Sequence, residues 1–151
     1  MVKWYEPSDL YKQLEPVIQG LGYQVAEFTH WISNNNFHAN LVIHSSNGIS
    51  VQDCSEVHRV IQQRIEALVP NEVYLTVSSP GLNKKIKFFQ EFTVYTGEPV
   101  KIMKENDNSW QKGVIVSTEN KVLSIEKPDG EIVSVPLHEI KKARLDNLQE
   151  G

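Results

Sequence analysis

Apolar residues in the first third of the chain follow a helical period and then a strand period. The helical run recurs every three or four residues, at Leu10, Leu14, Val17, Ile18 and Leu21. Ser8 stands before it as an N-cap, so a helix is expected here, with a bend or restart at Pro16 because proline costs ~3 kcal/mol inside a helix. Residues 23–29 and 37–44 are rich in strand formers and flank a turn at 33–36, which predicts a β-hairpin.

A second helix and a third strand follow the hairpin. Ser50 and Asp53 have the spacing of a capping box, with Asp in place of Glu. The apolar positions behind that cap keep helical spacing, at Cys54, Val57, Ile61, Ile65 and Leu68. Val73, Leu75 and Val77 then alternate as the apolar face of a strand. The first half therefore predicts an α/β sandwich of order α-β-β-α-β, with a layer of helices on a small mixed sheet.

The second half changes to short β-rich runs. They fall at residues 100–103, 113–116, 121–125, 131–135 and 140–145, and turn residues separate them. Residues 88–92 before them have the pattern of a short helical turn. Five short strands joined by tight turns are typical of a small β-barrel. The chain is thus expected to be α+β, with an N-terminal domain at 1–90 and a C-terminal barrel domain at 91–151.

Composition limits the classes of protein that fit. No apolar run approaches the ~20 residues of a membrane helix. The single cysteine, Cys54, excludes an internal disulfide framework. Residues 1–7 carry no apolar signal core, so a cytoplasmic location is expected. A net charge of −4 argues against indiscriminate coating of bare nucleic acid.

The segment after the third strand carries the densest candidate chemistry. Hydroxyl and turn residues are followed at once by positive charge, in the order Ser78, Ser79, Pro80, Gly81, Lys84, Lys85 and Lys87. Pro80 and Gly81 suit the second and third positions of a type II turn, in which the third residue has positive φ. Two interpretations stay open: a turn that only redirects the chain, or a site where hydroxyls and lysines meet a phosphate backbone or an acidic protein surface.

A weaker basic patch lies near the C-terminus. Strand alternation places Lys142 and Arg144 on one face and Lys141 on the other. Solvated surface charge is the alternative for all three residues. Trp110, expected on a hairpin rim, either stacks a base or packs within the hairpin.

The chain lacks the patterns of the common catalytic sites. His38 and His44 share a strand face and His30 can join them across the hairpin, but no carboxylate or cysteine accompanies them at ligand spacing. The serines of 78–81 lack the Gly-x-Ser-x-Gly elbow. Cys54 lies in a first helical turn without a base at helical spacing. We therefore expect a protein that is not an enzyme and uses no metal or cofactor.

Several pieces of the sequence, in order, resemble the RimP family of ribosome maturation factors. They are Leu-Glu-Pro-Val at 14–17 with Leu-Gly-Tyr at 21–23, the helix entry at 48–57, Val-Ser-Ser-Pro-Gly-Leu at 77–82, Gly-Glu-Pro-Val at 97–100 and the closing strand at 140–145. The resemblance implies an α/β N-terminal domain and an SH3- or Sm-like C-terminal barrel. It also implies a non-enzymatic assistant that binds the immature 30S ribosomal subunit near ribosomal protein uS12 and the central junction of 16S rRNA.

The sequence departs from the family pattern just after the shared motif. The family has Asp-Arg-Pro-Leu where this chain has Asn83, Lys84, Lys85 and Ile86. Lysine keeps the charge of arginine but loses the planar fork that binds phosphate or carboxylate with two hydrogen bonds. The contact geometry in this segment is therefore expected to differ from that of the family.

These observations give one expected partner-binding set. Its members are Ser78, Ser79, Pro80, Gly81, Lys84, Lys85, Lys87, Lys142 and Arg144. The expected partners are the immature 30S subunit, uS12 and 16S rRNA, with no membrane and with a monomeric protein, since no extended apolar stripe is visible. The alternative is a general RNA-binding module whose barrel acts like an Sm or OB fold.

Overall fold

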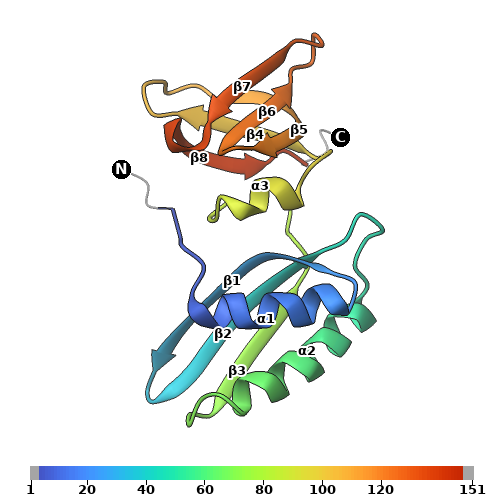
Figure 1. Ribbon diagram of the computed structural model, residues 1–151, viewed down its shortest axis with the longest axis vertical. Coiled ribbons are helices and arrows are strands. Elements are labelled where there is room, and N and C mark those ends of the chain that lie inside the picture. Colours follow the sequence, from blue (N-terminus) through green and yellow to red (C-terminus); the bar gives the residue numbers. More distant parts are fainter. Residues whose placement is uncertain (1–3, 148–151) are drawn as a thin grey trace. The chain divides into compact units, whose positions relative to one another are not determined.

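The computed structural model describes residues 4–147; residues 1–3 of the N-terminal stretch discussed above, and 148–151, lie outside that range. Within it the chain is α+β, with three α-helices and two β-sheets (Figure 1). It divides into two compact units, one from Glu6 to Pro80 and one from Gly81 onward that also takes in Trp4 and Tyr5. This division falls earlier in the chain than the boundary near residue 90 that the composition suggested. No helix in 4–147 is both long and apolar enough to cross a membrane.

The N-terminal unit contains two helices and a three-stranded sheet. In chain order the elements are α1 (Asp9–Gly20), β1 (Gln24–Ser33), β2 (Asn36–His44), α2 (Val51–Glu66) and β3 (Val73–Ser78). Strand β2 is central, antiparallel to β1 and parallel to β3. The parallel pairing requires a crossover between β2 and β3, and α2 provides it.

Helix α1 begins where its cap predicts. The Ser8 side chain accepts a hydrogen bond from the Tyr11 backbone N–H. The helix then runs through Pro16 as one element, without the expected restart. Its buried face, formed by Tyr11, Leu14 and Ile18, packs against the unit's core, while Pro16 is exposed. Packing of that face outweighs the one backbone hydrogen bond that proline removes.

The hairpin and the second cap are formed as the sequence predicts. Asn34 and Asn35 both have positive φ, 52° and 64°, as a two-residue hairpin turn requires. At the start of α2, Ser50 Oγ accepts from the Asp53 N–H at 3.0 Å, and Asp53 Oδ2 accepts from the Ser50 N–H at 2.8 Å. The capping box is therefore confirmed.

The two faces of the N-terminal sheet differ in character. Val57, Ile61 and Ile65 of α2 are fully buried and pack toward the face of the sheet that includes Leu41 and Leu75. The other face presents a row of rings, one from each strand: Trp31 of β1 pairs with His38 of β2, and His38 pairs with Tyr74 of β3. The rings are 5.5 and 5.4 Å apart, centroid to centroid, and nearly parallel.

The C-terminal unit is built on one antiparallel sheet. Its elements are α3 (Gln90–Val94), β4 (Pro99–Lys104), β5 (Gln111–Glu119), β6 (Val122–Glu126), β7 (Ile132–Pro136), the 3-10 turn Leu137–Glu139 and β8 (Ile140–Leu145). The strand order is β7-β6-β5-β4-β8. The five strands lie where the sequence predicts them. Among the described residues, however, the edge strands β7 and β8 do not pair with each other, so the sheet does not close into a barrel.

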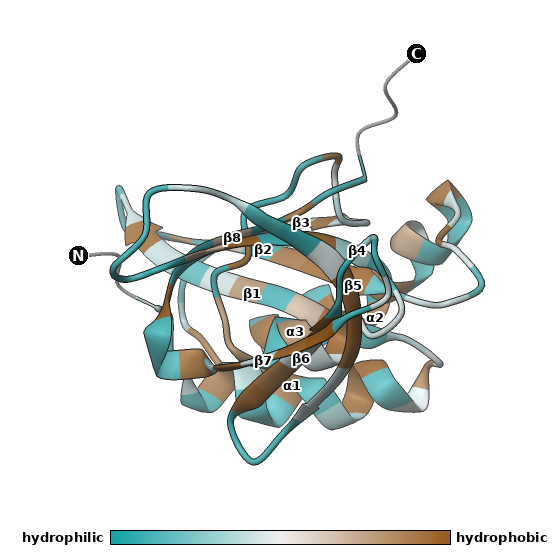
Figure 2. Cartoon of the chain, turned by 90° about the horizontal axis from the view of Figure 1, so that it is seen from above, coloured by the Kyte–Doolittle hydropathy of each residue, from teal (hydrophilic) through white to brown (hydrophobic). Residues whose placement is uncertain are grey.

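Apolar side chains line the inner face of this sheet. Buried core residues come from every strand and from the segment around α3, and include Phe92, Val100, Ile115, Leu123 and Ala143. In Figure 2 hydrophobic segments run along β5, β6 and β7. Gly113 of β5 allows a close approach to β6, because a Cβ atom there would lie 2.9 Å from the Glu126 carbonyl oxygen.

Candidate partner-binding site

The Ser-Ser-Pro-Gly stretch joins the two units. Ser78 ends β3, Ser79 is exposed, and the division between the units falls between Pro80 and Gly81. Gly81 does not have positive φ, so the expected type II turn is wrong. The turn lies two residues later, where Asn83 has φ 54°. Asparagine tolerates this left-handed conformation because its short polar side chain can hydrogen-bond locally.

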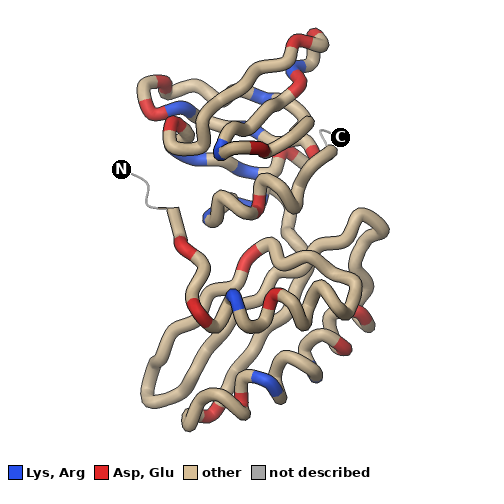
Figure 3. The backbone as a smooth tube through the Cα atoms, in the orientation of Figure 1, with Lys and Arg blue, Asp and Glu red and all other residues tan. Residues whose placement is uncertain are grey.

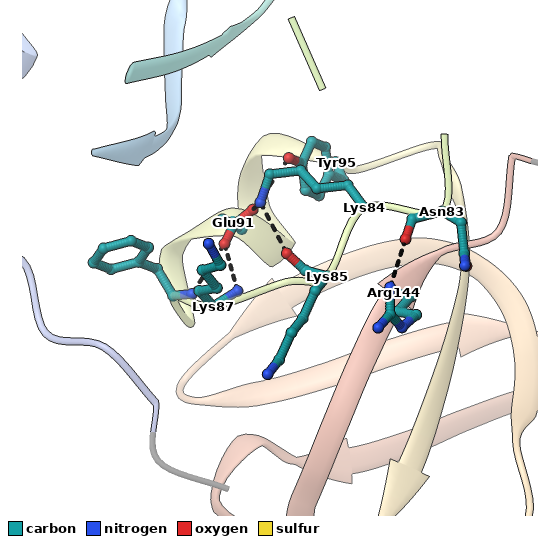
Figure 4. A network of polar contacts seen from close by, with 8 residues as sticks. Asn83, Lys84, Lys85, Lys87, Glu91, Tyr95 and Arg144 are labelled. Carbon is teal, nitrogen blue, oxygen red and sulfur yellow. Dashed lines mark hydrogen bonds and ion pairs between the residues drawn. The ribbon is translucent and has the colours of Figure 1, made fainter. Parts of the chain in front are cut away.

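Lys84 points into the C-terminal unit instead of toward solvent. Its Nζ lies 2.7 Å from Glu91 Oε1 and donates to the Lys85 carbonyl oxygen at 2.9 Å (Figure 4). The Lys84 and Glu91 side chains are only 11% and 0% exposed. This lysine therefore forms a buried ion pair within the unit, which limits what it can offer to a partner.

Glu91 connects the lysine segment to α3. Its Oε2 accepts hydrogen bonds from the backbone N–H groups of Lys87, at 2.6 Å, and Phe88, at 3.0 Å. The Tyr95 hydroxyl donates to Oε1 at 3.1 Å. Burial raises the pKa of the Glu91 carboxyl, although the Lys84 ammonium and the two N–H donors act in the opposite direction. The sequence-based prediction did not include this role for Glu91. The signal available was an acidic residue among the aromatic residues of a short predicted helix.

Lys85 and Lys87 are placed differently from Lys84. The segment around Lys85 pairs with the edge of β8: the Ile86 N–H donates to the Ala143 carbonyl and the Leu145 N–H to the Lys84 carbonyl, both at 2.9 Å. Lys85 is exposed and lies opposite Arg144 in this pairing. Lys87 is half-buried, with its Nζ 6.0 Å from the centre of the Tyr5 ring.

The C-terminal basic residues gather on the outer face of the sheet. Arg144 Nη1 donates to the Asn83 carbonyl at 3.0 Å. Lys142 Nζ lies 5.3 Å from the centre of the Trp110 ring, and Lys101 Nζ lies 5.0 Å from it. Trp110 thus contacts two cations, an arrangement that neither of the sequence-based interpretations included.

The remaining candidate groups are held in structural contacts. Burial, together with the charge of Asp53, raises the pKa of the Cys54 thiol, which opposes formation of the reactive thiolate. His30 Nε2 lies 3.0 Å from Ser8 Oγ, and His38 is stacked between Trp31 and Tyr74. Across residues 4–147 no three His, Cys, Asp or Glu side chains are grouped so that they could hold a metal ion.

Comparison with known proteins gives the family. A family model described as the RimP N-terminal domain matches residues 13–83. A protein of Borrelia recurrentis (strain A1) named ribosome maturation factor RimP is 30% identical over 145 residues, which cover 96% of this chain and 99% of the relative. Proteins of the same name from Borrelia turicatae (strain 91E135) and Borreliella burgdorferi (strain ZS7) are 28% and 27% identical, with the same coverage. The resemblance found in the sequence is confirmed, and the chain belongs to the RimP family of ribosome maturation factors.

Proposed function

We propose that this protein binds the immature 30S ribosomal subunit in the cytoplasm and assists its assembly without catalysing a reaction. The observation that carries the proposal is the extent of the relationship: the relative from Borrelia recurrentis matches over 96% of this chain and 99% of its own. The similarity to proteins named ribosome maturation factors therefore extends over both compact units and is not limited to one shared domain.

The proposed mechanism is selective binding. A protein that binds one conformer of an assembling particle more tightly than the others raises the population of that conformer. Two modest binding surfaces on one chain reinforce each other through effective concentration. No covalent chemistry is needed, and a monomer with two units is sufficient.

The members of the proposed partner-binding set differ in how accessible they are to a partner. Ser78, Ser79 and Lys85 are exposed and available to a partner. Lys84 is held by Glu91, so its contribution is to shape the segment. Lys87, Lys142 and Arg144 are half-buried, and Pro80 and Gly81 set the course of the chain between the units.

The proposed partners on the subunit are 16S rRNA and ribosomal protein uS12. We further propose that the C-terminal sheet is of the SH3 or Sm kind, on the support of its five short antiparallel strands and the 3-10 turn before the last one. Small sheets of this kind bind partners through loops and an open face.

Sedimentation tests the proposal. The protein is mixed with immature small subunits, mature small subunits or free 16S rRNA, and the pelleted fraction is measured. Selective pelleting with immature subunits is the expected result. Equal binding to naked RNA and to immature subunits would favour the general RNA-binding alternative, and no pelleting with any subunit would overturn the assembly role.

A further inference from the structure

A row of four basic residues crosses the outer face of the C-terminal sheet. In the pairing register Lys112 of β5 lies opposite Lys101 of β4, Lys101 lies opposite Arg144 of β8, and Arg144 lies opposite Lys85. Directly paired residues of an antiparallel sheet project from the same face. Lys112, Lys101, Arg144 and Lys85 therefore form one continuous line, here called the cationic row.

Lys142 and Trp110 lie beside the cationic row and widen it into a larger surface on the same side of the sheet. Lys142 lies two positions before Arg144 on β8 and so projects on the same side. The Trp110 ring contacts the ammonium groups of both Lys101 and Lys142, at 5.0 and 5.3 Å from the ring centre. One aromatic ring thus holds two lysines, which reduces the conformational freedom that they would lose on binding an anion.

The charge on this face is only partly balanced. Asp146 Oδ2 lies 4.0 Å from Lys112 Nζ, with 24% and 58% of the two side chains exposed. Glu126 lies beside Val114 in the register and belongs to the same side of the sheet. In Figure 3 blue segments gather along β8 while red segments mark the loop tips of the C-terminal unit. Positive charge is therefore collected on the sheet face of a unit whose acids lie mostly in its loops.

Like charges directly opposite each other destabilise a sheet. Three such pairs in succession are unfavourable for the isolated protein, so a multivalent anion that bridges them is the complementary partner. Adjacent strands are ~4.8 Å apart, and the row therefore spans about 14 Å. That length is enough for a nucleic-acid strand to place more than one phosphate beside the row.

We infer that the cationic row and Lys142 bind the phosphate backbone of a single-stranded RNA segment, with Trp110 as a positioning residue for Lys101 and Lys142. The inference deepens the proposed function, because it assigns RNA to one face of the protein. A protein partner is the alternative occupant, and the experiment separates the two.

The experiment measures binding of a fluorescein-labelled oligouridine of about 12 nucleotides by anisotropy at several salt concentrations. The row variant carries Lys101→Gln, Lys112→Gln and Lys142→Gln. The control variant carries Lys12→Gln, Arg59→Gln and Lys121→Gln, which changes the net charge equally at positions outside the row. Circular dichroism and urea unfolding establish that both variants are folded.

The row variant should bind the oligonucleotide at least about tenfold more weakly, because three charge-assisted contacts are lost. The slope of log affinity against log salt should fall by about 2, at ~0.7 per phosphate contact on a single strand. The control variant should change neither quantity. Trp110→Leu should weaken binding while leaving the slope near the wild-type value, since the charges remain, and Trp110→Phe should recover part of the affinity.

Equal oligonucleotide binding by the wild-type protein and the row variant would overturn the inference. So would loss of pelleting with immature subunits in a row variant that still binds RNA normally, because the face would then bind a protein. If the row variant loses RNA affinity but the wild-type protein never pellets with immature subunits, the proposed function fails and the RNA-binding face stands.

Discussion

The two sheets of this protein expose cross-strand rows of opposite chemical character. On the N-terminal sheet, Trp31, His38 and Tyr74 stack with interplanar angles of 8° and 20°. On the C-terminal sheet, the cationic row places lysines and an arginine opposite one another. Neighbours in the first row attract, with ~0.2–1 kcal/mol for an aromatic cross-strand pair, while neighbours in the second repel. The rings of the aromatic row stabilise one another, whereas the like charges of the cationic row require a bound anion to balance their repulsion.

The largest expected effect concerns the ion pair that holds one end of the cationic row. Lys84→Met leaves Glu91 buried without its cation, and removal of one partner of a buried pair costs about 3–5 kcal/mol. Urea unfolding of the C-terminal unit should show that loss. Lys85→Met, at the exposed neighbouring position, is the control and should change the free energy of unfolding by less than about 0.5 kcal/mol. Equal effects of the two substitutions would contradict the buried role of Lys84.

A second prediction tests whether the sheet carrying the cationic row is closely packed. Gly113→Ala brings a Cβ atom against the Glu126 carbonyl and the Ile125 side chain, so β5 and β6 must separate, at about 1–3 kcal/mol. Gly81→Ala is the matched control, because nothing lies within 4 Å of its Cβ position and its φ is not positive. Thermal unfolding should show a lower midpoint for Gly113→Ala alone. A large drop in the unfolding midpoint of Gly81→Ala would instead indicate that Gly81 adopts a backbone conformation that alanine cannot.

The aromatic row should contribute less to the free energy of unfolding than the buried ion pair or the close packing at Gly113. His38→Ala removes both ring contacts of the row, so a loss of about 1 kcal/mol is expected from two pairs of ~0.2–1 kcal/mol each. Asn40→Ala is the control, since Asn40 lies two residues along the same strand and on the same face. If urea unfolding shows that His38→Ala leaves the free energy of unfolding unchanged or raises it, the aromatic row does not stabilise the sheet, and the contrast with the repulsive cationic row fails.

The smallest effect is a dependence of N-terminal stability on pH. Hydrogen bonds from the Ser50 backbone, the Tyr23 hydroxyl and the Ser50 side chain hold the pKa of Asp53 below its ordinary value of 3.8. A lowered folded-state pKa contributes stability above pH 3.8, and that contribution disappears as the pH falls through the folded pKa. Comparison of wild type with Asp53→Asn in urea, at neutral pH and near pH 3, should show a smaller difference at the lower pH. The same difference at both pH values would argue against a role for the charge.

Local signals predicted most of the fold. The caps at Ser8 and Ser50, the asparagine turn and the strand alternation each depend on neighbours within a few residues, and each is present in the structure. Of the bend or restart expected at Pro16, the restart is absent, because helix packing outweighs the preference of proline. The positive φ expected at Gly81 was wrong, because the path of the chain between the two units sets its conformation.

The candidate site could be predicted only in part. The lysines were visible as a cluster, but the sequence does not show that Lys84 is buried against Glu91. The cationic row joins Lys112, Lys101, Arg144 and Lys85, which are far apart in the chain. Their alignment depends on strand register, which is set by pairing between distant segments.

The short pairing of residues 84–86 with β8 has a practical consequence for dissecting the molecule. A fragment that starts at residue 91 would lack Ile86 and Phe88, both nearly fully buried, and would strip the partner strand from Ala143 and Leu145. Such a fragment would present a bare sheet edge, a template for aggregation. A fragment that begins at Gly81 keeps this pairing, although it still lacks Trp4 and Tyr5, which belong to the same compact unit.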